Sequence, residues 1–222
     1  MNSFKFSSRI VEIIEKIEKK NSIIVDVGCD HCYTSIKALV EKKAKFAYNI
    51  DVNEKPLLSG IKNIKKFNLE KKTKNIIANG LDTNEIKKTV NYCIISGMGG
   101  KTICEIIQNK NKKIKIKNYI LVPNNNEYQL RLLLKKNGWA EKTFFIVEDN
   151  VIYQIVCVSL KKKKGYLIPD DEYSLWTGNS VLNKNKEKFV SNLIDKYTKI
   201  EKKANLNKYD SFIEMLKQNI NR

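Results

Sequence analysis

Long apolar runs are absent from this sequence. No stretch approaches the ~20 consecutive apolar residues that a membrane-spanning helix needs, and charged side chains appear as early as Lys5 and Glu12. A secretory signal would need an uninterrupted apolar segment in this region. We therefore expect a cytoplasmic protein without a membrane segment.

Histidine is nearly absent, and the cysteines do not pair off. His31 is the single histidine, and the number of cysteines is odd. The five cysteines are Cys29, Cys32, Cys93, Cys104 and Cys157. Such a set is typical of a reduced, intracellular protein and not of a disulfide framework. Cys29 and Cys32 have the spacing of half a zinc site, but no second ligand pair accompanies them. We expect no metal, and we favour small turn residues over a redox pair at these positions.

Acidic residues are far fewer than basic residues. Lys and Arg number 42 against 24 Asp and Glu, which gives a formal net charge of +18. A field of this size attracts polyanions, and nucleic acid is the commonest such partner. Nearly all of the positive charge is lysine, however, as codon bias from an AT-rich genome would also produce. We expect a nucleic-acid partner and keep a solvated lysine surface as the alternative.

The elements that can be predicted alternate between strand and helix. Apolar segments that read as strands lie at residues 23–28, 46–52, 73–79, 92–97 and 119–123, with helical patterns between them. Two further strands, residues 143–148 and 151–160, flank Asp149-Asn150, which reads as a tight hairpin turn. The alternation predicts an α/β fold with a parallel sheet, and the hairpin adds antiparallel strands at one edge.

A run of four lysines followed by Gly165 marks a boundary. We predict one domain over residues 1–164 and a smaller helical one over residues 165–222. In the latter, Phe189, Leu193 and Tyr197 begin an apolar stripe at helical spacing that resumes after residue 207, which predicts a coiled-coil-like hairpin of two helices. Its outer face is predicted to carry Lys184, Lys186, Lys188, Lys196, Lys199, Lys202, Lys203, Lys208 and Lys217.

A Gly turn and two carboxylates follow the first two strands. Parallel strands gather their carboxyl ends at one edge of a sheet, where ligands bind. The turn at Gly28 lacks the glycine-rich pattern that a pyrophosphate needs, and Asp30 stands where the second glycine would fall. An aspartate there suits a cofactor with a positive centre, such as S-adenosylmethionine. Asp51 ends the second strand, where a carboxylate accepts ribose hydroxyls; the alternative is that it only caps the next helix.

Two further turns are candidates for the same site. Asn79 and Gly80 follow the third strand, where we expect contact with an adenine ring; ordinary turn chemistry is the alternative. Gly97-Met98-Gly99-Gly100 follows the fourth strand. Its glycines allow close approach of the backbone to a ligand, although such runs also serve tight packing.

These motifs resemble those of a known family. The segment DVGCDHCY, from Asp26 to Tyr33, resembles the DIGSDHAY motif of the bacterial tRNA (adenine(22)-N(1))-methyltransferases, the TrmK family. The segment IISGMGG ending at Gly100 is similar to the family's IAGMGG signature, and LVPN ending at Asn124 is similar to its third block. The resemblance implies a Rossmann-like class I methyltransferase that uses S-adenosylmethionine to methylate N1 of an adenine in the D-arm region of tRNA, at position 22.

The sequence departs from the family's pattern at two places. Asn91 stands where an acidic residue usually opens the fourth strand, and Asn79 replaces the aspartate of the usual GDGL segment. Each change keeps an acceptor oxygen and removes a charge, so we expect an altered affinity for the cofactor.

The motifs suggest a role for each candidate residue of the site. We assign the cofactor to Asp26, Gly28, Asp51, Asn79, Gly80, Gly97 and Met98. Asp30 is the candidate catalytic residue, as charge stabiliser or base, and helix capping is the alternative. We assign the target base to His31, Tyr33, Gly99, Gly100 and Asn124; of these, the resemblance implies Asn124. Tyr33 would stack on a flipped adenine or be a core aromatic, and His31 would mainly orient the loop.

Two other classes of function remain open. The same core could methylate a small molecule, although the basic tail argues against this. The chain could also be an RNA-binding module that has lost catalysis. A nicotinamide enzyme is disfavoured by the failed glycine pattern. We favour a monomer, without a sequence feature that decides it.

Overall fold

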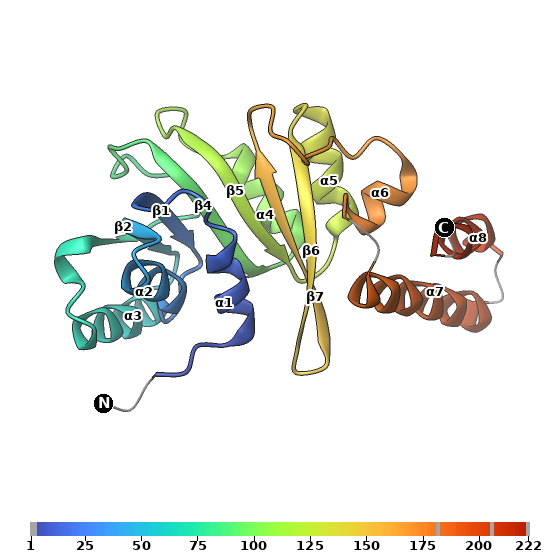
Figure 1. Ribbon diagram of the computed structural model, residues 1–222, viewed down its shortest axis with the longest axis horizontal. Coiled ribbons are helices and arrows are strands. Elements are labelled where there is room, and N and C mark those ends of the chain that lie inside the picture. The colour runs from blue at the N-terminus through green and yellow to red at the C-terminus, as the bar shows by residue number, and fades with distance from the viewer. Residues whose placement is uncertain (1–3, 181–182, 205–206, 221–222) are drawn as a thin grey trace.

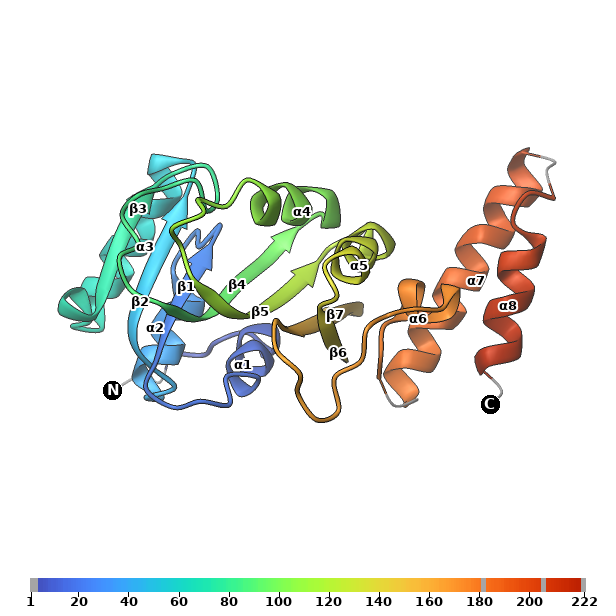
Figure 2. The same ribbon diagram turned by 90° about the horizontal axis from the view of Figure 1, so that it is seen from above.

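The computed structural model describes residues 4–180, 183–204 and 207–220. A sheet of seven strands runs through the molecule in the order β3-β2-β1-β4-β5-β7-β6, with helices on both faces (Figures 1 and 2). The strands are β1 (Ser22–Val27), β2 (Ala44–Asp51), β3 (Thr73–Ile77), β4 (Val90–Met98), β5 (Ile116–Pro123), β6 (Ala140–Glu148) and β7 (Val151–Ser159). The helices are α1 (Ser8–Glu15), α2 (Tyr33–Val40), α3 (Glu54–Lys66), α4 (Gly100–Gln108), α5 (Glu127–Lys136), α6 (Glu172–Thr177), α7 (Lys184–Ala204) and α8 (Asp210–Ile220), with a 3-10 turn at Glu70–Lys72.

The predicted α/β fold with a parallel sheet and an antiparallel edge is confirmed. Strands β3, β2, β1, β4 and β5 pair in parallel, while β7 runs antiparallel to β5 and β6 antiparallel to β7. The hairpin turn is at Asp149 and Asn150, which adopt φ of 49° and 62°. Residues with short polar side chains tolerate this left-handed conformation, which two-residue hairpin turns require.

Each face of the sheet buries one hydrophobic cluster. Ile13 of α1, Ile36 of α2 and Ile64 of α3 pack on one face with Ile24 and Ile94. On the other face, the apolar residues of α4 and α5 pack against the alternate strand positions, among them Ile103, Leu130, Val25, Val27 and Ile95. Strands covered on both sides need continuous apolar runs, which explains the composition of β1 and β4.

The apolar spacing of residues 10–17 predicts a helix over residues 4–20, but the helix in the structure begins later. α1 starts at Ser8, and the side chain of Ser7 accepts a hydrogen bond from the amide of Ile10. Phe4 and Phe6 precede this cap and pack with Tyr33 instead. The serine cap therefore ends the upstream extension of the helix.

The C-terminal helices α7 and α8 pack against each other as predicted. Ile213 and Leu216 of α8 are buried, and residues 205–206 of the predicted connecting turn lie outside the described residues. Lys186 was predicted to lie on the outer lysine face, but it is only 5% exposed and does not belong to that face. Within the described ranges, no helix is long and apolar enough to cross a membrane.

The segment before α7 packs on the sheet. Leu167 forms an antiparallel bridge with Glu141 of β6, and α6, which the sequence pattern did not reveal, packs on α5. The division into residues 1–164 and 165–222 stays a prediction. Residues 165–180 contact β6 and α5 of the first unit and also α7 and α8 of the second.

Candidate cofactor and methyl-acceptor site

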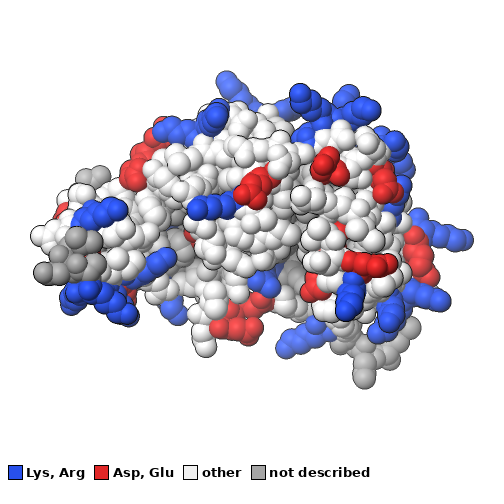
Figure 3. Space-filling view, turned by 180° about the vertical axis from the view of Figure 1, so that it is seen from behind, with Lys and Arg blue, Asp and Glu red and all other residues white. Residues whose placement is uncertain are grey.

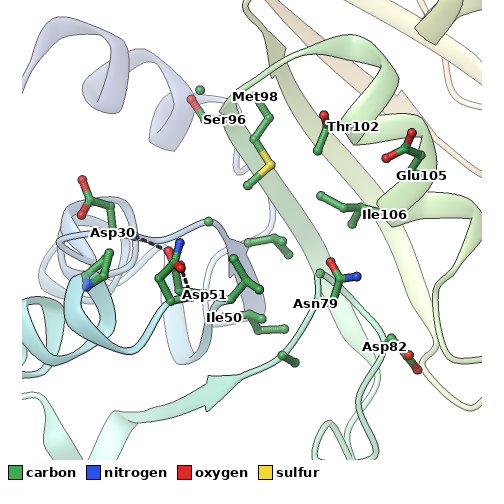
Figure 4. A pocket seen from close by; sticks show the side chains of 18 of the residues that line it. Asp30, Ile50, Asp51, Asn79, Asp82, Ser96, Met98, Thr102, Glu105 and Ile106 are labelled. Atoms are coloured by element: carbon green, nitrogen blue, oxygen red, sulfur yellow. Dashed lines mark hydrogen bonds between the residues drawn. The ribbon is translucent and has the colours of Figure 1, made fainter.

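A cavity of about 660 Å³ lies at the carboxyl ends of β1, β2 and β4, at the edge of the sheet where ligands bind in such folds. Figure 4 shows it between the turn after β1 on one side and helix α4 on the other. The predicted cofactor residues that line it are Gly28, Asp51, Asn79, Gly80, Gly97 and Met98, and Asp30 lines it as well. The sheet thus brings together turns that are up to seventy residues apart (28 to 98) in the sequence.

The turn after β1 depends on a glycine. Gly28 has φ of 70°, and a Cβ there would lie 2.1 Å from the Cε of Met98. Asp30 also has positive φ, 41°, and its amide donates to the Oδ2 of Asp51 over 3.3 Å. Its own side chain is 63% exposed. The N-cap position of α2 is taken by Cys32, so the capping alternative for Asp30 does not hold.

Asp51 is oriented by backbone groups. Its Oδ1 accepts from the amide of Asn53 over 2.9 Å, and its Oδ2 accepts from Asp30. Asn53 occupies the N-cap position of α3 but makes no side-chain capping bond. With both oxygens held and the residue 8% exposed, the carboxylate is fixed at the cavity wall.

Asp26 does not line the cavity. It is buried behind the turn after β1, where burial, the charge of Asp51 and a hydrogen bond from the Ser35 amide act on it. Burial, reinforced by Asp51, raises its pKa to about 7. Its Oδ2 has no hydrogen-bond partner among the described residues. A buried carboxyl with a free oxygen beside a cavity can respond to a cation that enters it.

The lining is one-sided in charge. It contains the carboxylates of Asp30, Asp51, Asp82 and Glu105, and none of the described lining residues is Lys or Arg. Such a wall favours a cation and disfavours a pyrophosphate. The volume and the oriented carboxylate fit a nucleoside that bears a sulfonium and an ammonium group, which is the composition of S-adenosylmethionine.

Helix α4 forms one wall of the cavity, which was not predicted from the sequence. Thr102 and Glu105 line the cavity from α4 (Figure 4), and Asn109, the C-cap residue of this helix, lines it as well. Their spacing of three and four residues was a usable signal, because such residues share one helix face. Asp82, which follows the turn at Gly80 expected near the adenine, lines the cavity as well.

The predicted substrate residues lie outside the cavity lining. The Nδ1 of His31 is 3.0 Å from the Oγ of Ser59 on α3, and its carbonyl accepts from Asn63 over 3.2 Å. These bonds tie the loop to α3, in line with the expected orienting role. The ring of Tyr33 lies 4.8 Å from that of Phe4, which places it in an aromatic cluster over α2.

The other predicted substrate residues make packing contacts or hydrogen bonds within the protein; they are Gly99, Gly100 and Asn124. A Cβ on Gly100 would lie 2.3 Å from the carbonyl oxygen of Asn126, so this glycine serves close packing. A Cβ on Gly99 would lie 2.8 Å from the Oδ1 of Asn125. Asn124 is exposed, and its Nδ2 donates to the carbonyl of Gly97 over 2.8 Å. Asn124 therefore supports the glycine turn that lines the cavity.

Two sequence features prove to be structural. The Sγ atoms of Cys29 and Cys32 are 3.6 Å apart, and their hydrogen bond, together with burial, raises the pKa of Cys29. A buried Cys29 thiol with a raised pKa fits the preferred interpretation as a turn residue. Asn91 lies at the opposite end of β4 from the cavity, where its Oδ1 accepts from the Ile23 amide over 2.8 Å. Its missing charge therefore does not act directly on a ligand.

Comparisons with known proteins converge on one family. Residues 24–222 match the model of TrmK, tRNA (adenine(22)-N(1))-methyltransferase. The tRNA (adenine(22)-N(1))-methyltransferase of Bacillus subtilis is 30% identical over 159 residues, which cover 70% of this chain and 66% of that protein. The structure of Mycoplasma capricolum TrmK with S-adenosyl-homocysteine is 29% identical at a TM-score of 0.78, with 98% of this chain and 96% of that chain covered. Streptococcus pneumoniae Sp1610 in complex with S-adenosyl-L-methionine is 26% identical at a TM-score of 0.76, with 98% of each chain covered.

Proposed function

The chain belongs to the TrmK family of tRNA (adenine(22)-N(1))-methyltransferases, and from this premise we propose how its residues carry out the reaction. The enzyme uses S-adenosylmethionine to methylate N1 of adenine 22 of tRNA. The observation that carries the assignment of the site is the cavity at the strand ends, whose charged lining residues are all carboxylates.

The cofactor is held by the strand ends. Asp51, fixed by two backbone amides, accepts the ribose hydroxyls. Asn79 and Gly80 would hold the adenine, at the end of the cavity that Asp82 and the α4 side chains also line. Gly28 and Gly97 let the backbone approach the methionine moiety. When bound, S-adenosylmethionine supplies an electrophilic methyl group on a positively charged sulfur.

Asp30 faces the methyl acceptor. With S-adenosylmethionine and a flipped adenine bound, the N1 lone pair would form a bond to the methyl carbon as the carbon–sulfur bond breaks, and the positive charge would pass to the adenine ring. The exposed carboxylate of Asp30, at the cavity rim, stabilises this charge or accepts the N6 proton afterwards. His31 holds the loop through Ser59, and Asn124 holds the opposite rim through Gly97.

The Asp30 assignment is tested by two variants. Asp30→Ala is expected to lower kcat on tRNA by about 100-fold, while the affinity for S-adenosylmethionine stays within about threefold of wild type. Asp30→Asn keeps the shape and removes the charge, so it should resemble the alanine variant. Wild-type kcat in Asp30→Asn would show that only the shape of the residue matters and that Asp30 is neither base nor charge stabiliser.

The tRNA is bound in part by the C-terminal helices. Lysines on the outer faces of α7 and α8 are exposed, and phosphate contacts of this kind position a nucleic acid without reading its sequence. Viewed from behind, basic side chains gather around the periphery of the molecule, and most of the centre is uncharged (Figure 3). The exposed lysines of α7 and α8 add positive charge that a polyanion can contact.

The function is tested by mapping methyladenosine in tRNA. An unmodified tRNA transcript is incubated with the enzyme and S-adenosylmethionine, digested and analysed by mass spectrometry; a transcript with guanine at position 22 is the control. We expect one methyl group, at N1 of adenine 22, and none in the control. Cofactor binding without any methylated tRNA would contradict the function and favour an RNA-binding module or a small-molecule methyltransferase.

A further inference from the structure

An arginine is buried where the sheet meets the C-terminal segment. Arg131 of α5 is fully buried, and its guanidinium pairs with Glu141 of β6, Nε to Oε1, at 3.4 Å. It also donates to the Oγ1 of Thr143 over 3.0 Å and to the side-chain oxygen of Gln154. None of these residues lines the cofactor cavity. The reaction described above leaves this buried pair without a role.

The cluster around Arg131 also contacts the chain that connects α6 and α7. Gly178 has φ of 78°, and a Cβ there would lie 2.4 Å from both the Nη2 of Arg131 and the Oγ1 of Thr143. The amide of Asn179 donates to Glu141 over 2.7 Å, and its carbonyl accepts from the amide of Thr143 over 2.9 Å. The connection is therefore pinned to β6 by a charged side chain and a backbone bond.

The first turn of α7 is held as well. Lys186 is 5% exposed, and its Nζ donates to the carbonyls of Gly178 and Ser180 over 3.3 and 3.2 Å. Burial and the charge of Arg131 lower its pKa. Asn185 donates from Nδ2 to the carbonyl of Phe145 on β6 over 3.1 Å. The helix thus leaves the sheet in a defined direction.

Trp176 joins four helices at one point. Its ring centroid lies 4.8 Å from that of Tyr128 on α5, 4.6 Å from Phe212 on α8 and 5.7 Å from Tyr197 on α7. Its Nε1 donates to Glu172 over 3.0 Å. Aromatic contacts of this kind have preferred geometries, so they fix an angle as well as adding stability. We call Arg131, Glu141, Gly178, Asn179, Lys186 and Trp176 the junction.

The angle that the junction sets has a large effect at a distance. α7 has 21 residues, so it is ~30 Å long. A tilt of ~10° at its first turn would move its far end by about 5 Å, more than the about 3.4 Å between neighbouring nucleotides of one duplex strand. Buried ion pairs seldom add net stability over an apolar core, but in some proteins they specify one arrangement.

We propose that the junction fixes the angle between the α7–α8 hairpin and the cofactor cavity and thereby selects which adenine of the bound tRNA is methylated. This rests on the proposed function, because the hairpin must bind tRNA while an adenine enters the cavity. The junction residues are positioning residues that act through the hairpin.

The test uses full-length Trp176→Ala and Lys186→Met. Each removes part of the junction without stranding Glu141 as an unpaired buried charge. We expect kcat on tRNA to fall by up to about 100-fold, as for other displacements remote from the chemistry, and methyladenosine to appear at adenines other than position 22. Affinity for S-adenosylmethionine, measured by calorimetry, should stay within about twofold, because the cavity is untouched.

Lys203→Gln is the matched control. Lys203 is exposed on α7 and makes no junction contact, so its loss should raise KM for tRNA and leave the methylated position unchanged. If Trp176→Ala does not fold, Lys186→Met carries the same comparison, and cofactor affinity confirms that the core is intact.

Failure of the junction proposal and failure of the proposed function would give different results. If proteolysis shows that the α7–α8 hairpin is loosened in the variants, yet they methylate only position 22 with wild-type kcat, the junction serves stability alone and the proposal is overturned. If wild-type enzyme methylates no tRNA, the proposed function itself is wrong and the inference falls with it.

Discussion

The clearest physical prediction concerns Asp26, whose pKa is raised from 3.8 to about 7 by burial and by Asp51. The folded state then holds a proton that the unfolded state has lost, over the whole window between these two values. Stability therefore falls as pH rises through this window, by about 1.4 kcal/mol per pH unit. The full window corresponds to at most about 4 kcal/mol, of which ~3 kcal/mol lies between about pH 5 and about pH 7.

Asp26→Asn removes this titration and keeps the shape of the side chain. The variant and wild type should be compared by urea unfolding without ligand from about pH 5 to about pH 8. The free energy of unfolding of the variant should gain on that of wild type as pH rises, and the difference should level off above about pH 7. Asp51→Asn removes the second cause of the shift, so in that variant the transition should move to lower pH.

A constant difference between wild type and Asp26→Asn across this range would refute the reasoning, since it would mean that Asp26 does not change its protonation there. The same titration affects binding. A cation in the neighbouring cavity favours the ionised carboxyl, so the affinity of wild type for S-adenosylmethionine should rise from about pH 6 to about pH 8, with release of a proton. In Asp26→Asn this rise should be absent.

Three further predictions concern other parts of the molecule. Asp51→Asn should raise the Kd for S-adenosylmethionine by about 10- to 100-fold in calorimetry, because charge-assisted bonds to the ribose are lost; an effect below about threefold would exclude them. Lys203→Gln should reduce the slope of log affinity for tRNA against log salt by about one unit, whereas Lys161→Gln, at the sheet edge opposite the cavity, should not change it. Cys104, the one half-exposed thiol among the described residues, should be alkylated first in the native protein, and its pKa of about 11, raised by burial, means that the rate should still be increasing at about pH 10.

The parallel half of the fold could be predicted because its signals are local. Each of β1, β2 and β4 is an apolar run that ends in a turn residue, and parallel connectivity brings those ends together. Gly28, Asp51 and Gly97 were therefore assigned to one site from spacing alone. The wall formed by Thr102 and Glu105 required a further step, which is to ask which face of the following helix closes the same cavity.

The junction could not be predicted, because its partners are far apart in the sequence. Lys186 sits in a lysine-rich segment and reads as solvated, yet its Nζ is satisfied by carbonyls on the preceding turn. Glu141 interrupts the apolar pattern of β6, so the strand appeared to begin at residue 143 and not at Ala140. Glu141 is buried because Arg131, on another element, pairs with it. The charge of Glu141 in turn favours the buried ammonium of Lys186, which Arg131 disfavours.

The carboxylates of the cavity leave the rate to be explained by geometry. Positive charge is present on the methyl donor before the reaction and on the adenine ring after it, so an evenly acidic wall stabilises both states. Stabilisation that is equal in the ground and transition states tightens binding without raising kcat. Only a group placed at the acceptor side, as we propose for Asp30, favours the movement of the charge. The remaining acceleration must come from the position of the base relative to the methyl group. We attribute this position to the angle between the α7–α8 hairpin and the cavity.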